Sequence, residues 1–282
     1  MFTSLINASE LQQLLPLKDL VIIDCRFALS DTNSGRNDYL AGHIPNAQYA
    51  HLDDDLSGTI IPGSTGRHPF PEIEDITQKI SHWGISEKTQ VVAYDQGHGG
   101  IAARLWFMLK WLGHSKVAVL NGGWKNWKEN DLPVNTRILN VSPSIFLPRP
   151  NTDRVVSVEQ IEQNLDHSTE LLVDSRSEER YRGDHEPIDP VAGHIPNAIS
   201  APYAGNLDDS GLFKSKEDLS KRFDQLLKGY PQDKTIFYCG SGVTACHNLL
   251  ALSYIGKDQA KLYPGSWSEW ITKVKRPIAI TK

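Results

Sequence analysis

Short apolar runs alternate with amphipathic stretches along the chain. Four runs of apolar and β-branched residues predict buried strands, at residues 20–26, 90–94, 171–176 and 235–238. Residues 245–255 carry apolar side chains at helical spacing and predict a helix directly after the last strand. Capping-box patterns at Ser9–Gln12 and Ser157–Gln160 predict two further helix starts. Strands that alternate with helices predict an α/β fold, in which mostly parallel sheets are flanked by helices.

The pattern occurs twice. The sequence Ala-Gly-His-Ile-Pro-Asn-Ala stands at residues 41–47 and again at 192–198, and a Gly-x-Trp-x-x-Trp element begins at Gly122 and at Gly265. A repeat of half the chain length predicts two tandem domains, at residues 1–135 and 157–282. The segment 136–156 contains several prolines and is expected to be an extended linker.

Composition narrows the class of protein. The chain has 282 residues, 39% of them hydrophobic, and a formal net charge of −5, which argues against a nucleic-acid partner bound through bulk charge. Its apolar runs are too short for a membrane span, and its first residues lack the pattern of a signal peptide. Three cysteines with no metal-ligand spacing suggest neither a disulfide framework nor a zinc site. A cytoplasmic protein is therefore expected.

The loop that begins at Cys239 is the strongest candidate for chemistry. It lies between a predicted strand and a predicted helix, and Gly240 and Gly242 allow the backbone to bend tightly. Backbone N–H groups and the positive end of a helix can then surround the sulfur and favour the nucleophilic thiolate. The first copy has Asp95 at this place, so we expect the first domain to be non-catalytic.

The loop sequence Cys-Gly-Ser-Gly-Val-Thr-Ala at 239–245 resembles the active-site loop of the 3-mercaptopyruvate sulfurtransferases, in the rhodanese superfamily. The resemblance covers nearly the whole chain and implies two rhodanese-like domains, the second one catalytic. It implies that Cys239 carries a persulfide, whose outer sulfur is bound by N–H groups of the loop. The loop residues with this role are Gly240, Ser241, Gly242, Val243, Thr244 and Ala245.

Further site residues are implied by the same resemblance. Arg180, in Arg-Tyr-Arg-Gly, matches an arginine that contacts the substrate anion; Arg182 is the second candidate there, although such a charge run is usually a solvated loop. Ser241, His68 and Asp55 match a proposed Ser-His-Asp proton relay. Arg67 is a further candidate for the substrate carboxylate. On spacing alone, the segments of Asp55 and His68 are ordinary turns.

Features that both copies share are interpreted as scaffold. These are His43 and His194, the pairs Asp24/Arg26 and Asp174/Arg176, and the tryptophans of the repeated element.

The expected function is sulfur transfer from 3-mercaptopyruvate through Cys239 to a thiol, such as that of a thioredoxin-like protein, or to cyanide, with no metal or organic cofactor. The neutral Gly240-Ser241 favours a monoanionic donor over thiosulfate. However, the mercaptopyruvate enzymes have a second arginine near the place of Ile188 and Asp189, so thiosulfate stays the alternative.

More distant alternatives are a cysteine phosphatase, which would need an arginine at the place of Ala245, and a non-enzymatic sulfur-carrier or binding module. The physiological acceptor, the oligomeric state and the role of Cys246 are left open by the sequence.

Overall fold

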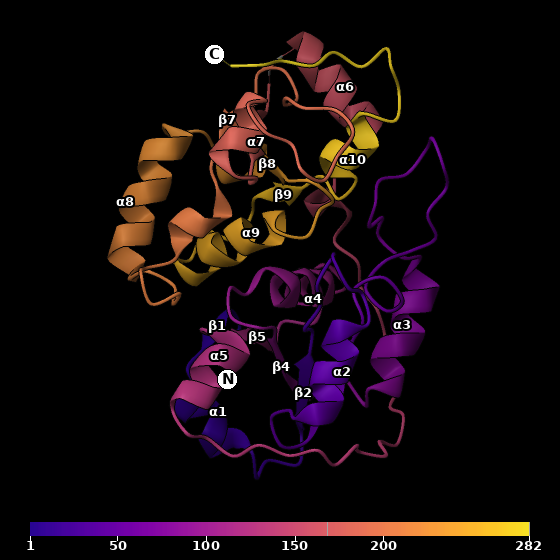
Figure 1. Cartoon of the computed structure of the whole chain (residues 1–282), viewed down its shortest axis with the longest axis vertical. Coiled ribbons are helices and arrows are strands. Elements are labelled where there is room, and N and C mark those ends of the chain that lie inside the picture. Colours follow the sequence, from indigo (N-terminus) through magenta and orange to yellow (C-terminus); the bar gives the residue numbers. More distant parts are fainter. Residues whose placement is uncertain (168, 282) are drawn as a thin grey trace. The chain divides into compact units, whose positions relative to one another are not determined.

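The structure is a computed structural model that describes residues 1–167 and 169–281 (Figure 1). The chain divides into two compact units. The first unit comprises Met1–Gly58, Pro71–Asn151 and Asp209–Phe213, and the second comprises Thr59–Phe70, Thr152–Asp208 and Lys214–Lys282. Among the described residues, no helix has the length and the apolar character needed to cross a bilayer.

A five-stranded sheet forms the centre of the first unit, with all neighbouring strands parallel and the order β1-β5-β4-β2-β3. The strands are β1 (Leu5–Ile6), β2 (Leu20–Asp24), β3 (Ala47–Tyr49), β4 (Gln90–Tyr94) and β5 (Val117–Leu120). Asp24 pairs with Tyr94, so β2 and β4 end side by side at the edge where ligand-binding loops emerge in such folds.

Helices cover this sheet because its strands bury both faces. They are α1 (Ala8–Leu14), α2 (Ser34–Ala41), α3 (Ile73–His82), α4 (Gly100–Trp111) and α5 (Gly123–Glu129). Ile22 and Val92 share a core with residues of α1, α2 and α5. The helix α4 is buried along nearly its whole length and packs on β4 and β5.

The second unit repeats the design with a four-stranded parallel sheet of order β7-β6-β8-β9. Its strands are β6 (Leu171–Asp174), β7 (Ile199–Ser200), β8 (Thr235–Tyr238) and β9 (Lys261–Leu262). Its α-helices are α6 (Val158–His167), α7 (Glu178–Arg182), α8 (Lys216–Leu227), α9 (Ala245–Tyr254) and α10 (Ser266–Trp270), and its short 3₁₀ turns are η1 (Thr152–Arg154), η2 (Tyr203–Asn206) and η3 (Gln232–Lys234). Trp267 and Trp270 of α10 are fully buried against this sheet.

The predicted α/β fold with two flanked parallel sheets is confirmed, and the four predicted strands and the helix after Cys239 are present. Three details differ. The first helix is capped by Asn7, whose N–H donates to the Glu10 carboxylate at 2.8 Å, and not by Ser9. The segment of Arg180 and Arg182 is a helix, not a loop. The predicted linker contributes 136–151 to the first unit and 152–156 to the second, and the segments 59–70 and 209–213 each cluster with the other half of the chain.

The shared charged pairs serve the scaffold. Arg26 donates to Asp24, with a shortest distance of 2.6 Å, and to the Gly42 carbonyl at 2.7 Å. Arg176 repeats both contacts with Asp174 and the Gly193 carbonyl at the same distances. His43 and His194 are buried, and the Nδ1 atom of each lies 2.7 Å from a backbone carbonyl. Because these contacts recur in both units, they hold the strand ends in place.

Candidate active site

Cys239 follows β8 directly, and only 2% of its surface is exposed. The helix α10 fixes the backbone on both sides of it. The Cys239 N–H donates to Ser266 Oγ at 3.1 Å, and the Trp267 N–H donates to the Cys239 carbonyl at 3.0 Å. Gly242 has φ of +73°, and a Cβ atom there would lie 2.3 Å from the Pro264 carbonyl oxygen. The tight loop around Cys239 therefore requires glycine at position 242.

The first unit shows what such a loop binds. Asp95 follows β4 as Cys239 follows β8, and its carboxylate accepts four backbone N–H groups. The donors are Gly97 and Gly99, at 3.0 and 2.9 Å to Oδ1, and Ile101 and Ala102, at 3.0 and 3.3 Å to Oδ2. This loop architecture thus points N–H groups at one anion. In the second unit, Cys239 stands at the corresponding place, directly after β8.

A histidine contacts a hydroxyl group of the Cys239 loop. His68 Nδ1 lies 2.8 Å from Ser241 Oγ, and both residues are buried. His68 comes from the segment Thr59–Phe70, which clusters with the second unit although it lies more than 170 positions before Ser241. A histidine bonded to a hydroxyl can accept its proton and return it, which is the geometry of general acid–base catalysis.

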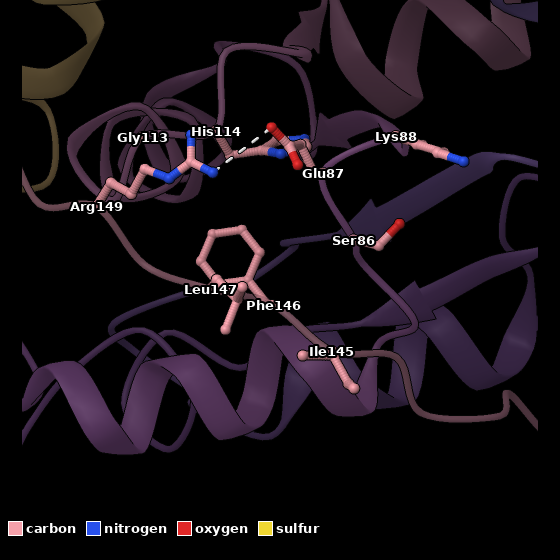
Figure 2. A pocket seen from close by; sticks show the side chains of 9 residues that line it. All are labelled: Ser86, Glu87, Lys88, Gly113, His114, Ile145, Phe146, Leu147 and Arg149. Atoms are coloured by element: carbon pink, nitrogen blue, oxygen red, sulfur yellow. Dashed lines mark ion pairs between the residues drawn. The ribbon is translucent and has the colours of Figure 1, made fainter.

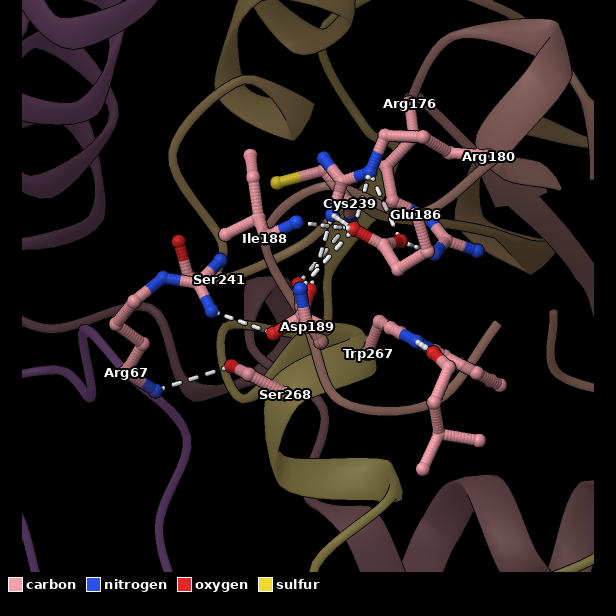
Figure 3. A network of polar contacts seen from close by, with 12 residues as sticks. Arg67, Arg176, Arg180, Glu186, Ile188, Asp189, Cys239, Ser241, Trp267 and Ser268 are labelled. Carbon is pink, nitrogen blue, oxygen red and sulfur yellow. Dashed lines mark hydrogen bonds and ion pairs between the residues drawn. The ribbon is translucent and has the colours of Figure 1, made fainter. Parts of the chain in front are cut away.

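Two arginines meet at one carboxylate beside the loop (Figure 3). Asp189 accepts Arg67 Nη1 at 2.5 Å through Oδ1 and Arg180 Nη2 at 2.9 Å through Oδ2. The Asp189 side chain is 2% exposed, so the desolvated carboxylate is compensated by both guanidinium groups. The Arg67 N–H donates to Ser268 Oγ at 3.0 Å, which anchors the same segment to α10.

Both guanidinium groups face Gly240. A Cβ atom at this glycine would lie 3.2 Å from Arg67 Nη2, 3.4 Å from Arg180 Nη2 and 3.6 Å from Arg180 Nη1. The absence of a side chain at position 240 therefore lets the two cations lie against the backbone next to Cys239. An anion held there would lie beside Gly240, the residue that follows Cys239.

Glu186 connects this cluster to the scaffold. Its carboxylate accepts Arg180 Nε at 3.0 and 2.9 Å, Arg176 Nη1 at 3.3 Å, and the N–H groups of Ile188 and Asp189 at 3.0 and 3.1 Å. Burial opposes ionisation of Glu186, but the bonds from Arg180 and from these N–H groups outweigh it, and its pKa lies below the ordinary value. Because Arg176 also binds Asp174, Arg180 is linked to the end of β6.

Two candidates lie outside this cluster. Asp55 belongs to the first unit, where it accepts the His51 N–H at 2.7 Å and pairs with Lys79 at 2.8 Å. Its part in a relay with His68 stays a prediction. Arg182 is 45% exposed and pairs with the exposed Asp184 at 2.8 Å. Since Arg180 and Arg182 are two positions apart in a helix, their side chains point about 200° apart.

Three residues of the site were not singled out by the sequence as participants. Ser266 holds the Cys239 N–H, Glu186 orients Arg180, and Asp189 bridges the arginines. The signal for Ser266 was in the repeat, because the first copy has Gly123 at the equivalent place of its Gly-x-Trp-x-x-Trp element. Its positive φ of +56° matches the +53° of Gly123, so the copies share this backbone and differ in the hydroxyl.

The first unit contains a cavity of about 390 Å³ that carries none of this chemistry. Figure 2 shows its lining, which consists of Ser86, Glu87, Lys88, Gly113, His114, Ile145, Phe146, Leu147 and Arg149. Arg149 and Glu87, both largely exposed, pair at 3.7 Å. Burial lowers the pKa of His114, which disfavours its charged form.

Comparisons with known proteins agree with this arrangement. The rhodanese-like domain model matches residues 7–130 and 157–273. A probable 3-mercaptopyruvate sulfurtransferase of Pseudomonas aeruginosa is 44% identical over 98% of this chain and 97% of its own length. The thiosulfate sulfurtransferase of Rattus norvegicus is 32% identical over 90% of this chain and 86% of its own. The structure of the 3-mercaptopyruvate sulfurtransferase from Leishmania major has a TM-score of 0.85 at 28% identity and covers 98% of this chain and 76% of its own.

Proposed function

Because the chain belongs to the rhodanese family and is a sulfurtransferase, we propose that its donor is 3-mercaptopyruvate and that Cys239 carries the transferred sulfur as a persulfide. The observation that carries the choice of donor is the contact of 2.8 Å between His68 and Ser241 in the Cys239 loop. Pyruvate leaves as an enolate that must take up a proton, whereas thiosulfate leaves a stable sulfite that needs none. A proton-transfer pair beside the nucleophile is useful only for the first donor.

In the first half-reaction, the Cys239 thiolate attacks the thiol sulfur of 3-mercaptopyruvate. A sulfur–sulfur bond forms, the carbon–sulfur bond breaks, and its electron pair goes to the methylene carbon of the enolate. The proton of the donor thiol passes through Ser241 and His68 to this carbon, so that pyruvate and the persulfide anion result. Arg67 and Arg180, which face Gly240, bind the donor carboxylate. N–H groups of the residues from Gly240 to Ala245 stabilise the outer sulfur, as the Asp95 loop stabilises its carboxylate.

In the second half-reaction, the outer sulfur passes to an acceptor thiolate or to cyanide, and Cys239 is released as the thiolate. We propose a small thiol or a thioredoxin-like protein as the natural acceptor. The cycle has two stages and uses one cysteine, and we propose that it needs no metal or organic cofactor. We propose a reducing cytoplasm as its location, in which the buried cysteines Cys25, Cys239 and Cys246 stay as thiols.

Intact-protein mass spectrometry tests the proposal directly. Wild type and Cys239→Ser are incubated with 3-mercaptopyruvate or with thiosulfate, without acceptor. We expect the wild type to gain one sulfur atom, faster from 3-mercaptopyruvate, and the variant to gain none. Equal loading of Cys239→Ser would refute the assigned nucleophile.

Thiosulfate is the second candidate donor, because no arginine stands near Ile188 and Asp189, where the mercaptopyruvate enzymes have their second substrate-binding arginine. Faster loading from thiosulfate in the same experiment would establish this alternative and leave the role of Cys239 unchanged.

A further inference from the structure

Asp189 is a buried carboxylate inside the cationic part of the site. Its two oxygens divide their contacts, with Arg67 on Oδ1 at 2.5 Å and Arg180 on Oδ2 at 2.9 Å. The two arginines come from segments more than 110 positions apart and have Asp189 as a common partner (Figure 3). Asp189 therefore brings together the two guanidinium groups that face Gly240.

The charge of this cluster is balanced before any donor binds. Arg67 and Arg180 contribute two positive charges, and Glu186 and Asp189 contribute two negative ones. Glu186 also binds Arg176 and two backbone N–H groups, so it is part of the scaffold. The Asp189 side chain is hydrogen-bonded to both arginines, so its charge acts mainly on them.

We propose that Asp189 is a positioning residue that sets the donor preference of Cys239. It holds Arg67 and Arg180 side by side, and its charge makes the site accept a monoanionic donor in preference to a dianionic one. This inference rests on the proposed function and deepens it.

The charge argument follows from Coulomb's law. A carboxylate beside the bound donor repels a dianion twice as strongly as a monoanion at the same distance. In a site that excludes water, this difference is screened only weakly by salt. Removal of the Asp189 charge should therefore raise kcat/KM for both donors, and for thiosulfate more than for 3-mercaptopyruvate.

The first experiment compares kcat/KM for thiosulfate and for 3-mercaptopyruvate in Asp189→Asn. We expect the ratio of thiosulfate to 3-mercaptopyruvate to rise about tenfold. Asp189→Glu keeps the charge and should keep the ratio within about threefold of wild type. Asp184→Asn is the matched control, because this carboxylate lies in the same segment but is 51% exposed and pairs with the exposed Arg182. An unchanged ratio in Asp189→Asn, or an equal rise in Asp184→Asn, would overturn the proposal.

A second measurement does not depend on the donor. Cys239 is alkylated with iodoacetate, which is an anion, and with iodoacetamide, which is neutral, and the modified cysteine is identified by peptide mass spectrometry. We expect Asp189→Asn to raise the ratio of the iodoacetate rate to the iodoacetamide rate severalfold, because only iodoacetate is an anion. Asp184→Asn should leave this ratio unchanged. A merely structural role of Asp189 would alter both rates together.

The two measurements separate the possible failures. If neither donor loads Cys239, the proposed function is wrong, while the alkylation ratio still decides whether Asp189 controls the charge at this cysteine. Circular dichroism checks that each variant is folded. Asp189→Ser replaces Asp189→Asn if the latter is unfolded, and the same rise in both ratios is expected from it.

Discussion

At the scale of single residues, the proposed function assigns to Ser241 a role with only one of the two donors. Its hydroxyl lies 2.8 Å from His68 Nδ1, and we assign this pair to the proton that the enolate needs. Ser241→Ala should lower kcat/KM for 3-mercaptopyruvate about 100-fold, because positioned proton transfer contributes a factor of this order. The value for thiosulfate should change only a few-fold. Steady-state kinetics with cyanide as acceptor measures both. An equal loss with both donors would show that Ser241 only supports the loop.

Alanine substitutions at two glycines of the Cys239 loop should have different effects. Gly242→Ala places a residue with φ of +73° and a Cβ atom 2.3 Å from the Pro264 carbonyl, so we expect a loss of about 3 kcal/mol in the free energy of unfolding. Gly240→Ala brings its Cβ 3.2 Å from the end of the flexible Arg67 side chain. It should leave stability nearly unchanged and raise KM for the donor about tenfold by displacing the guanidinium.

Urea unfolding and steady-state kinetics of both glycine variants test this pair. Comparable losses of stability would contradict the assignment of Gly240 to substrate access.

The sequence identified the residues whose chemistry is visible locally. Cys239 stands in a strand–loop–helix pattern that is visible locally, whereas Ser241, Arg180, Arg67 and His68 were predicted from the resemblance. The structure places the side chains of these four residues around the loop that begins at Cys239. Asp189 could not be recognised, because its partner Arg67 is 122 positions away and a single aspartate carries no pattern. The importance of this carboxylate comes entirely from tertiary contacts.

At the scale of elements, the loop between β4 and α4 depends on its own carboxylate. Asp95 is 1% exposed and accepts four N–H groups. Asp95→Ala should lower the free energy of unfolding of the first unit by about 3 kcal/mol, because it leaves buried donors unpaired. Asp95→Asn keeps one oxygen acceptor and should cost less. Urea unfolding measures the stabilities of wild type, Asp95→Asn and Asp95→Ala. In both variants, Cys239 should be loaded with sulfur at the wild-type rate. A stable Asp95→Ala would show that water can replace the carboxylate.

The connection after α7 should respond to acid through Glu186. Its pKa is lower in the folded protein than the ordinary value of 4.5, so its ionised form stabilises the fold. This stabilisation is complete above pH 4.5 and is lost as the pH falls through the lower pKa of the folded state. Glu186→Gln should therefore be less stable than wild type at pH 7, by about 2 kcal/mol.

Thermal unfolding between pH 3 and pH 7 tests this expectation about Glu186. The difference between variant and wild type should shrink toward the acidic end. A difference that is constant across the range would assign the loss to shape rather than to charge.

The helix α7 is an element that hydrophobic periodicity does not reveal. It has five residues, which is too short for a helical period to be visible in the sequence. Yet its local signals are present, since Ser177 precedes it and Gly183 ends it with φ of +85°. The helix matters for the site, because an extended segment would place Arg180 and Arg182 on the same face.

At the scale of the whole molecule, the two units do not coincide with the two halves of the sequence. The repeat predicted two α/β domains, because strand and helix patterns are local and occur twice. It could not predict that residues 59–70 cluster with the second unit, since this depends on contacts such as that of the Arg67 N–H with Ser268.

Hydrogen exchange should follow the units rather than the halves. Destabilisation by Gly242→Ala should speed exchange in β6, β8 and β9 and also at the Arg67 amide, which donates to Ser268 Oγ at 3.0 Å. Asp95→Ala should speed exchange in β2, β4 and β5 instead. Exchange resolved by peptide mass spectrometry decides the matter. An Arg67 amide that responded to Asp95→Ala would contradict its assignment to the second unit.

The clustering of residues 59–70 with the second unit has a consequence for recombination between related sulfurtransferase genes. The half of the sequence that has Asp95 in its loop supplies Arg67 and His68 to the unit that contains Cys239. Recombination between related genes at the linker would therefore combine a nucleophile with foreign partners. Chimeric proteins should take the cysteine from one parent and part of the donor selectivity from the other.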